Sequence, residues 1–195
     1  FTVGPRLNAA GRLEDMRLGV ECLLTDDVAQ ARRCAEQLNA INLERRDLQA
    51  SMVAEAEQMV VGMTDIDAIG VALYEPSWHA GIVGLVASKL KDRLHRPVIA
   101  FAPASEDDTD NLRGSARSIA GFHIRDALAA IDARQPGLIE RFGGHAMAAG
   151  LSLKTCDYPR FAVAFDAVAR ELIDAERLQA VLYTDGELPR GAASL

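Results

Sequence analysis

The spacing of apolar residues predicts a long helix in the first third of the chain. No glycine or proline interrupts residues 20–61, and Cys34, Leu38 and Ile41 belong to a series of apolar residues repeating every three, four or seven positions. Such spacing places apolar side chains along one stripe of a helix. Thr25 supplies an N-cap before two aspartates. The pattern predicts one helix over residues 26–62, which would be about 50 Å long at 1.5 Å per residue.

The centre of this predicted helix, residues 42–49, is strongly polar. A long helix with a polar centre typically spans two bodies and is exposed between them. A dimerising coiled coil is the alternative interpretation. The pattern favours a connector helix.

After residue 66 the pattern changes to short apolar runs separated by helical periodicity. The runs that predict strands are residues 69–74, 97–101, 112–119 and 148–153. The segments that predict helices are residues 81–94, 124–131 and 159–175. Strands that alternate with helices predict a layered α/β domain with a mixed sheet, here over residues 63–179.

Composition and charge narrow the functional classes. The net charge of −7 argues against a protein that coats nucleic acid through bulk positive charge, although a local basic groove remains compatible with it. The acidic residues 106–110 predict a solvated loop. Cys22, Cys34 and Cys156 lack metal-ligand spacing, which favours reduced thiols in a cytoplasmic protein. No apolar run is long enough for a membrane span, so no membrane partner is expected.

Residues 113–118 read Arg-Gly-Ser-Ala-Arg-Ser, which alternates polar with small residues. On an extended segment Ser115 and Arg117 would point to the same face, and Arg113 would join them. A hydroxyl and a guanidinium on one face suit a cluster of phosphate oxygens. The alternative is a plain strand whose polar face lies in solvent.

Residues 143–150 form a second candidate site. Gly143 and Gly144 precede His145, and glycines let the backbone approach a ligand closely because no Cβ intervenes. His145 could stabilise a phosphoryl transition state or act as a general acid. A structural or solvated histidine is the alternative.

Residues 4–12 place Arg6, Asn8 and Arg12 between glycines and alanines. We predict a loop in which Arg6 or Arg12 contacts an anion and Asn8 fixes the backbone. The alternative is a loop held together by arginine hydrogen bonds alone.

Residues 76–81 lead from a predicted strand into a predicted helix. Trp78 could stack on a nucleic-acid base, and Ser77 or His79 could cap the helix or bind an anion at its start. The alternative is a simple turn with a packed tryptophan.

Hydrolysis by a two-metal centre needs a cluster of carboxylates and histidines, and the sequence contains no such motif. We therefore expect no metal ligands in this chain. If the protein uses metals, they should be bound upstream of Phe1. Because the first residue is Phe1 and lies within a motif, we expect the chain to be a fragment of a longer protein.

Five segments together resemble the RecJ family of the DHH/DHHA1 phosphoesterase superfamily. They are GPRLNAAGR (4–12), WHAGIVGLVASKL (78–90), RPVIAFA (96–102), GSARSIAGFHIRDAL (114–128) and FGGHAMAAGLSL (142–153). The resemblance divides the chain into four parts. They are the C-terminal edge of a DHH domain (1–25), a connector helix (26–62), a DHHA1 domain (63–179) and the start of an OB-type domain (180–195).

The resemblance implies a 5′-to-3′ exonuclease that removes nucleotides from single-stranded DNA in repair and recombination. It implies Mn²⁺ or Mg²⁺ held by the DHH domain, with none bound by this chain. It also implies a cytoplasmic monomer that works with a helicase and single-strand-binding protein.

By the same resemblance, Ser115 and Arg117 would hold the terminal 5′-phosphate, helped by Arg6 or Arg12. His145 would lie at the phosphate that is cleaved. Two other functions remain open. One is a related phosphoesterase acting on short RNA or cyclic dinucleotides, and the other is a non-catalytic nucleic-acid-binding module.

Overall fold

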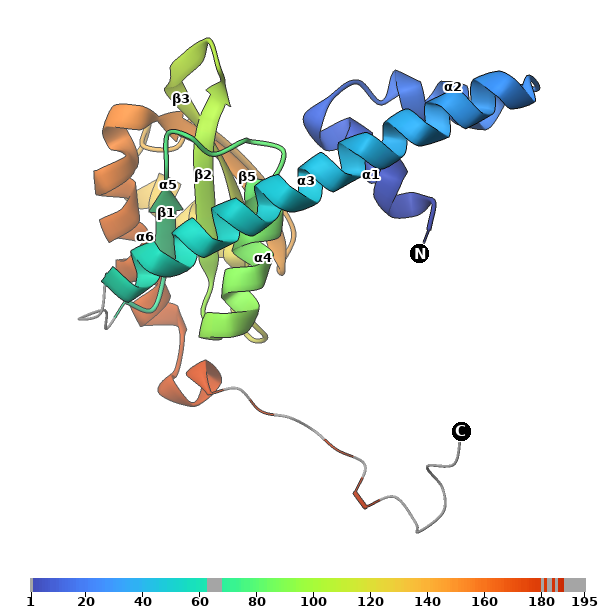
Figure 1. The fold of residues 1–195 in the computed structure, drawn as a ribbon. Helices are drawn as coiled ribbons and strands as arrows, with labels where there is room; N and C mark the ends of the chain where they lie inside the picture. The colour runs from blue at the N-terminus through green and yellow to red at the C-terminus, as the bar shows by residue number, and fades with distance from the viewer. Residues whose placement is uncertain (1, 63–67, 180, 182–183, 185, 188–195) are drawn as a thin grey trace.

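The computed structural model describes residues 2–62, 68–179, 181, 184 and 186–187. A long helix, α3 (Val28–Gly62), joins two parts of the molecule. Two short helices, α1 (Gly4–Leu13) and α2 (Arg17–Leu24), lie against its first half, and a sheet with its own helices lies at the other end (Figure 1). The expected start of a further domain at residues 180–195 falls mostly outside the described residues.

The structure confirms the long helix, and its two halves make different contacts. The first half packs against α1 and α2. The second half contributes Met52 and Ala56 to a core shared with α4 (Val83–Leu94). The polar centre is exposed at residues 43, 44, 46 and 47, as predicted, whereas Asn42 is only 6% exposed and its Oδ1 accepts a hydrogen bond from Arg45 at 2.8 Å.

The loop predicted for residues 4–12 is wrong, because this segment is the helix α1. Pro5 lies in its first turn, where a missing N–H costs nothing. Ala9 and Ala10 are buried. Their small side chains permit the close approach of α1 to α3. The helix α2 was not predicted at all.

The five-stranded sheet has the order β1-β2-β3-β5-β4. Its strands are β1 (Val71–Tyr74), β2 (Val98–Ser105), β3 (Asp108–Arg117), β4 (Arg141–Gly144) and β5 (Ala148–Lys154). Only the β1–β2 pair is parallel among these pairs, so the predicted mixed sheet is confirmed.

The predictions for the regions of β3 and β4 need correction. The acidic residues 106–110 are not a loop throughout, because β3 begins at Asp108 and only a tight turn separates it from β2. The predicted strand 112–119 therefore starts and ends too late. Strand β4 was missed because two of its four residues are glycines, which are weak strand formers.

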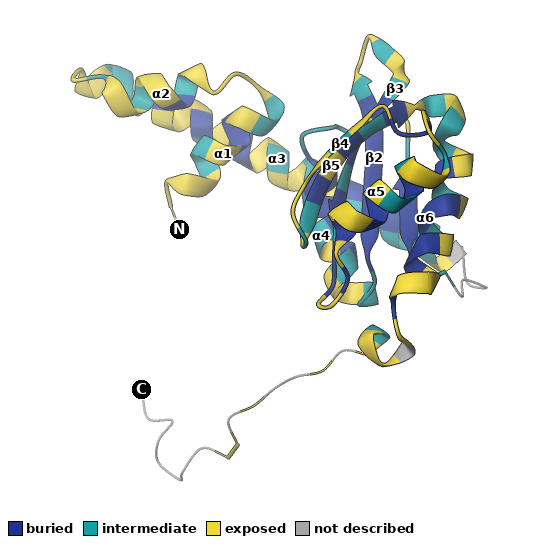
Figure 2. Ribbon diagram, turned by 180° about the vertical axis from the view of Figure 1, so that it is seen from behind, coloured by how far each residue is buried: buried dark blue, intermediate teal, exposed yellow. Residues whose placement is uncertain are grey.

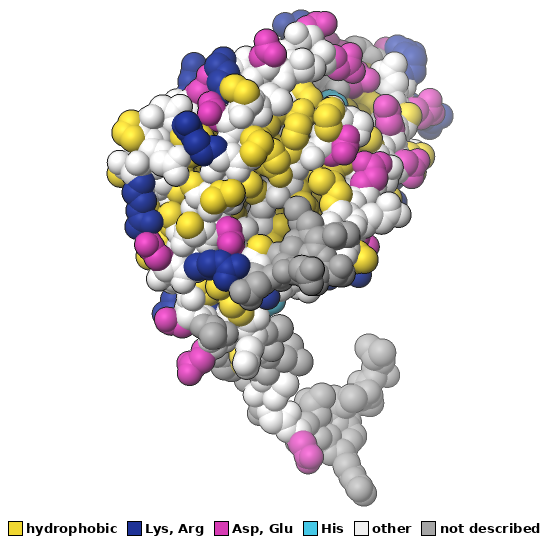
Figure 3. Space-filling view, turned by 90° about the vertical axis from the view of Figure 1, so that its left-hand side faces the viewer, with side chains coloured by type: hydrophobic (Ala, Val, Ile, Leu, Met, Phe, Trp, Pro, Cys, Tyr) yellow, Lys and Arg dark blue, Asp and Glu magenta, His cyan; other side chains and the backbone are white. Residues whose placement is uncertain are grey.

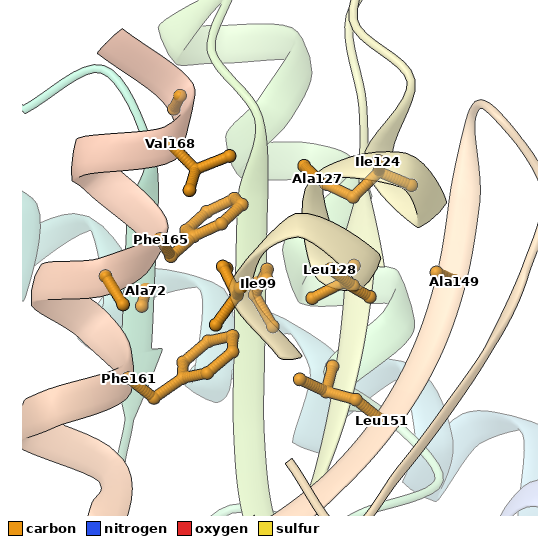
Figure 4. Packing of buried hydrophobic residues seen from close by; sticks show 14 of the residues in the cluster. Ala72, Ile99, Ile124, Ala127, Leu128, Ala149, Leu151, Phe161, Phe165 and Val168 are labelled. Atoms are coloured by element: carbon orange, nitrogen blue, oxygen red, sulfur yellow. The ribbon is translucent and has the colours of Figure 1, made fainter. Parts of the chain in front are cut away.

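The sheet lies between two helical layers. Helices α5 (Ile124–Arg134) and α6 (Tyr158–Leu172) pack on one side, and α3 and α4 pack on the other (Figures 1 and 2). Figure 4 shows Phe161 and Phe165 of α6 pointing toward Ile99 of the sheet. Two short 3-10 helices, Thr155–Asp157 and Ala175–Leu178, flank α6.

Tyr158 is partly buried against the core of the α5/α6 layer. Its hydroxyl donates to the carbonyl of Ala72 at 3.0 Å, and burial raises the pKa of Tyr158 to about 12. Its ring also meets Phe101 edge-on, with the ring centroids 5.7 Å apart.

Figure 3 shows the side of the molecule that carries α6 and the edge strand β1. Hydrophobic side chains gather in the middle of this side, and acidic as well as basic side chains lie around its margin. Val163 of α6 is 73% exposed here. This side is therefore unsuited to binding a polyanion. None of the described helices is long and apolar enough to cross a membrane.

Candidate nucleic-acid interface

One side of the sheet is only partly covered. Helix α4 packs on β2 and β3 and leaves β5 and β4 open on the same side. On the opposite side α5 contacts both β4 and β5. Gly143, Gly150 and Arg141 are consequently exposed on the α4 side. We call this side of β3, β5 and β4 the open face.

Strand register arranges the open face in three rows, because alternate residues of a strand point to the same side. Arg113 pairs with Ser152, which pairs with Arg141. Two residues further along β3, Ser115 pairs with Gly150, which pairs with Gly143. These are the first and second rows.

The third row is formed by Arg117, Ala148 and His145. Arg117 pairs with Ala148, whose carbonyl accepts a hydrogen bond from the His145 backbone N–H at 2.8 Å. Neighbouring strands lie about 4.8 Å apart, and alternate residues of a strand lie about 7 Å apart. The rows therefore bring together residues 113–117 and 141–145, which the sequence singled out separately.

Ser115 and Arg117 do share one face, as predicted. The Arg117 guanidinium donates to Ser115 Oγ at 2.9 Å and to the Ala116 carbonyl at 2.8 Å. Gly84 of α4 leaves room for this pair, since a Cβ there would stand 2.9 Å from Ser115 Oγ and 3.0 Å from Arg117 Nη2. Burial, and secondarily the charge of Arg12, lower the pKa of Arg117.

Arg12 is the arginine of α1 that reaches this region. Its guanidinium donates to the carbonyl of Gly81 at 3.1 Å, just before α4. Arg6 lies elsewhere, because its Nε donates to Asn39 of α3 at 3.0 Å and its Nη1 to the Thr2 carbonyl at 2.6 Å. The structure thus brings Arg12, but not Arg6, to Arg117. Asn8 is exposed on α1 and fixes no loop.

A cleft of about 750 Å³ lies where α1, the β1–α4 connection and the β2–β3 hairpin meet. His79 lines it, and its Nδ1 accepts a hydrogen bond from the Gly81 N–H at 3.0 Å. Arg12 and Arg113 lie on its walls. His79 therefore orders the backbone just before α4, but the helix has no side-chain cap at its N-cap Ile82, so the prediction that His79 caps it is wrong.

The prediction that Trp78 stacks on a base is wrong for this structure. The side chain is 3% exposed and belongs to the core between α3 and α4. Its Nε1 donates to Glu55 of α3 at 3.0 Å. Trp78 fastens the sheet domain to the long helix.

A shallow groove of about 510 Å³ crosses the open face beside this cleft. Arg113 lines both hollows, and Arg141 lies at the far wall of the groove. Sequence reasoning missed Arg141. The signal was available, because Arg141 and Gly143 are two residues apart and must share a face if the segment is a strand.

The two adjacent glycines have different roles. Gly144 has φ +139°, and a Cβ there would stand 2.5 Å from the Ala149 Cα. This position requires glycine for the hairpin itself. A Cβ at Gly143 would meet nothing within 4 Å, so glycine is not needed there for folding. Its absent side chain keeps the groove floor open.

His145 is exposed at the β4–β5 turn. Backbone bonds fasten this turn, because Ser118 N–H donates to the Met147 carbonyl at 3.0 Å and Ile124 N–H to the Ala146 carbonyl at 3.0 Å. The backbone that carries His145 is thereby held beside the Arg117 row. Within the described residues, no group of three His, Cys, Asp or Glu side chains could hold a metal ion.

Comparisons with known proteins show to which family this fold belongs. The DHHA1 domain model matches residues 66–173. The single-stranded-DNA-specific exonuclease RecJ of Dickeya dadantii is 50% identical over 191 residues, which cover 96% of this chain and 33% of that protein. The Escherichia coli RecJ is 46% identical over the same share of this chain, 96%, and 33% of its own length.

Solved structures give the same result. RecJ from Thermus thermophilus in complex with Mg²⁺ superimposes with a TM-score of 0.75 at 30% identity, covering 89% of this chain and 26% of that one. An exonuclease RecJ bound to manganese gives 0.74 at 31% identity, with 91% and 42% covered. The chain spans about a third of the length of the curated relatives it matches. It belongs to the DHHA1 domain family, and over nearly its whole length it is similar to RecJ proteins.

Proposed function

We propose that this chain is the substrate-recognition part of a RecJ-type 5′-to-3′ exonuclease acting on single-stranded DNA. The proposed substrate comes from the relatives, which are named single-stranded-DNA-specific exonucleases. The chain matches only about a third of their length, so we propose that it is one part of such an enzyme. In this proposal residues 1–25 belong to the edge of a catalytic domain, 26–62 are a connector, and 63–179 bind the DNA.

The observation that carries the proposal is the Ser115–Arg117 pair facing Arg12. Arg117 is half-buried, and burial together with Arg12 lowers its pKa. Two neighbouring guanidinium groups repel each other, so the pair favours an anion placed between them. A terminal 5′-phosphate carries more charge than an internal phosphodiester and offers three oxygens to these donors.

His145 completes the arrangement. It lies in the same row as Arg117 with one strand between them, which places the two Cα atoms about 10 Å apart. A strand whose 5′-phosphate is held by Arg117 would pass over Gly143 and present a following phosphate to His145. The Ser115–Arg117 pair would thus act as a ruler that fixes the cleavage position from the 5′ end.

Two of the similar RecJ structures are described with Mg²⁺ and with manganese. The described residues of this chain do not provide a fitting set of ligands, so we assign them no metal. Their part is to bind the strand, orient it and hold its end. The hydrolytic chemistry itself belongs to the remaining length of the RecJ-type protein.

A binding assay on this chain tests the proposal. The ligands are a short oligothymidylate with a 5′-phosphate and the same oligothymidylate with a 5′-hydroxyl. Arg117→Ala should cost about 1–3 kcal/mol of binding free energy for the phosphorylated strand, because a charged hydrogen-bonding group is lost. Binding of the 5′-hydroxyl strand should change little.

Arg160→Ala is the matched control, because Arg160 is exposed on α6, away from the open face. Equal losses for both oligonucleotides with Arg117→Ala would remove Arg117 from the end site. A wild-type chain that ignores the 5′-phosphate would contradict the proposed function itself.

A further inference from the structure

The first row of the open face, which contains Arg113, Ser152 and Arg141, has no part in end recognition. The Arg117 guanidinium donates to Ser115 Oγ at 2.9 Å, so a 5′-phosphate held by this pair lies at the second row. The first row lies two residues further along the strands, which is about 7 Å. A space therefore remains between the held phosphate and the first row.

The proposed function places the terminal nucleoside of the strand next to this space. Its 5′-phosphate is held by Ser115 and Arg117, and the phosphate on its 3′ side faces His145 in the third row. The sugar that joins these two phosphates then lies over β5 and β4, whose second-row residues are Gly150 and Gly143. From this position a base that points along the strands reaches the first row.

The floor of the groove on the open face suits a flat ring. The groove has a volume of about 510 Å³, and Gly143 and Gly150 pair with each other on its floor. A Cβ at Gly143 would meet nothing within 4 Å, and at Gly150 only the Gly114 carbonyl oxygen at 3.9 Å. Packing requires neither glycine, and both leave a strip of bare backbone on which a planar base can lie.

The side walls of the groove provide no stacking partner for a base. Ala80 and Val83 line the wall on the α4 side. Phe142 is the aromatic residue among the described lining residues, and it packs into the core with α5 and α6. Its ring cannot serve as a stacking platform on the open face. A base in the groove would therefore be recognised through its edge.

Two arginines of the first row are available to that edge. Arg113 and Arg141 stand on either side of Ser152, two strand spacings apart, so their Cα atoms lie about 10 Å from each other. Both side chains are exposed, and neither makes a hydrogen bond or ion pair with any described residue. The acid next to Arg141 in sequence, Glu140, is paired with Lys154 at 3.2 Å. The first row thus presents two guanidinium groups and a hydroxyl to the groove.

These donors distinguish among the bases by hydrogen-bond chemistry. A guanidinium group only donates, and its planar fork fits two adjacent acceptors. Guanine offers such a pair in O6 and N7, whereas adenine carries an amino donor in place of O6. Thymine offers the single acceptor O4, and cytosine offers an amino donor. Guanine is therefore the base that fits the first row best.

We infer that the groove is a pocket for the 5′-terminal base of the strand, and that Arg113 and Arg141 make this pocket prefer guanine. The inference rests on the proposed function, because the phosphate at Ser115 and Arg117 fixes where the terminal base lies. It adds residues that determine specificity for the nucleotide at the end of the strand. Phosphate contacts alone carry no base information.

A titration of the wild-type chain with three small ligands tests the inference. They are 2′-deoxyguanosine 5′-monophosphate, 2′-deoxyadenosine 5′-monophosphate and 2-deoxyribose 5-phosphate, which has no base. The two nucleotides have the same charge and nearly the same size, so the ratio of their affinities reports on the base edge. The wild type should bind the guanine nucleotide about five- to tenfold more tightly than the adenine nucleotide, as expected for a bidentate arginine contact in an exposed groove.

Variants of the two arginines separate the base contact from the effect of charge. Arg113→Met and Arg141→Met should each lower the ratio to about two or less, because hydrogen-bond donors are lost. Arg113→Lys and Arg141→Lys keep the charge but lose the planar fork. They should lose the preference for guanine and bind 2-deoxyribose 5-phosphate within about twofold of the wild type.

Arg160→Met is the matched control on α6 and should leave the ratio as in the wild type. Matching thermal unfolding curves would show that the variants fold. A 5′-phosphorylated oligothymidylate gives a second readout when its first nucleotide is replaced by guanine or by adenine. The preference should disappear when the replaced nucleotide is moved to the fourth position, because only the terminal base reaches the first row.

The outcomes separate the two claims. If the wild type binds both nucleotides equally, or if the lysine variants keep the full preference, the base pocket is wrong while end recognition stands. If Arg117→Ala leaves binding of 2-deoxyribose 5-phosphate unchanged, the proposed end site is wrong. A wild-type chain that binds none of the three ligands would overturn both.

Discussion

The two sides of the sheet are built from the same strands but have different roles. On the α5/α6 side, Leu112, Leu151 and Leu153 are buried among aromatic rings. On the other side of β5 and β4, the corresponding positions carry glycine, serine and arginine and stay open.

Residues 112–117 of strand β3 alternate between the closed core and the open face. Leu112, Gly114 and Ala116 point into the closed core, whereas Arg113, Ser115 and Arg117 lie on the open face. A strand can serve both purposes because its side chains alternate with a period of two. The closed side supplies stability, and the open side can therefore tolerate clustered charges that would cost stability elsewhere.

The largest effect should come from the closed side. Phe161 is fully buried and stacks 6.1 Å from Phe165 while meeting Phe101 edge-on at 5.4 Å. Phe161→Ala should lower the free energy of unfolding by about 3–5 kcal/mol, because a large cavity remains. Chemical denaturation measures this change. If Phe161→Ala kept the wild-type stability but lost DNA binding, the α5/α6 side would be the binding side, which would contradict our assignment.

Two glycines provide a sharper test of the same contrast. A Cβ on Gly114 would clash with the Phe101 ring and stand 2.7 Å from Leu151 Cδ2, whereas a Cβ on Gly143 meets open space. Gly114→Ala should cost about 1–3 kcal/mol of stability through overpacking. Gly143→Ala should leave stability unchanged within about 0.5 kcal/mol, as for an unstrained surface site.

For DNA binding, Gly143→Ala should have the larger effect and Gly114→Ala the smaller. Gly143→Ala places a methyl group on the groove floor and should weaken binding of single-stranded DNA, whereas folded Gly114→Ala should bind as the wild type does. Titration of both variants with one oligonucleotide checks this. Unchanged affinity in Gly143→Ala would show that the strand does not cross this part of the open face.

The smallest effect concerns the far end of α4. His95 ends this helix with φ +49°, a left-handed conformation that glycine adopts more readily. His95→Gly should stabilise the chain by about 0.5 kcal/mol, since the relief of backbone strain exceeds the entropic cost. Thermal unfolding measures the gain. DNA binding should stay the same, because His95 lies outside both hollows.

Sequence periodicity was sufficient for elements with strong apolar patterns. The long helix and the α/β alternation were predicted correctly because Leu38, Ile41 and Met52 repeat at helical spacing and the strand runs are buried. The Ser115–Arg117 pairing was also predictable, since it needs only an extended backbone.

Other features depended on contacts that no local pattern contains. Helix α1 forms in a segment with glycines because Ala9 and Ala10 are buried. Arg6 and Arg12 look equivalent in sequence, and only the packing of α1 directs Arg12 toward Gly81 and Arg6 toward Asn39. Arg141 was missed because its strand is short and glycine-rich, and its role depends on register with Arg113 through Ser152.

The central claim is that the open face of the sheet, and not the α5/α6 side, receives the 5′ end of single-stranded DNA. An NMR titration of this chain with an oligothymidylate, with and without a 5′-phosphate, tests it most directly. We predict phosphate-dependent shifts of the amides of Ser115 and Arg117, with little change along α5 and α6. Shifts confined to α5 and α6, or shifts on the open face that do not depend on the phosphate, would contradict the account.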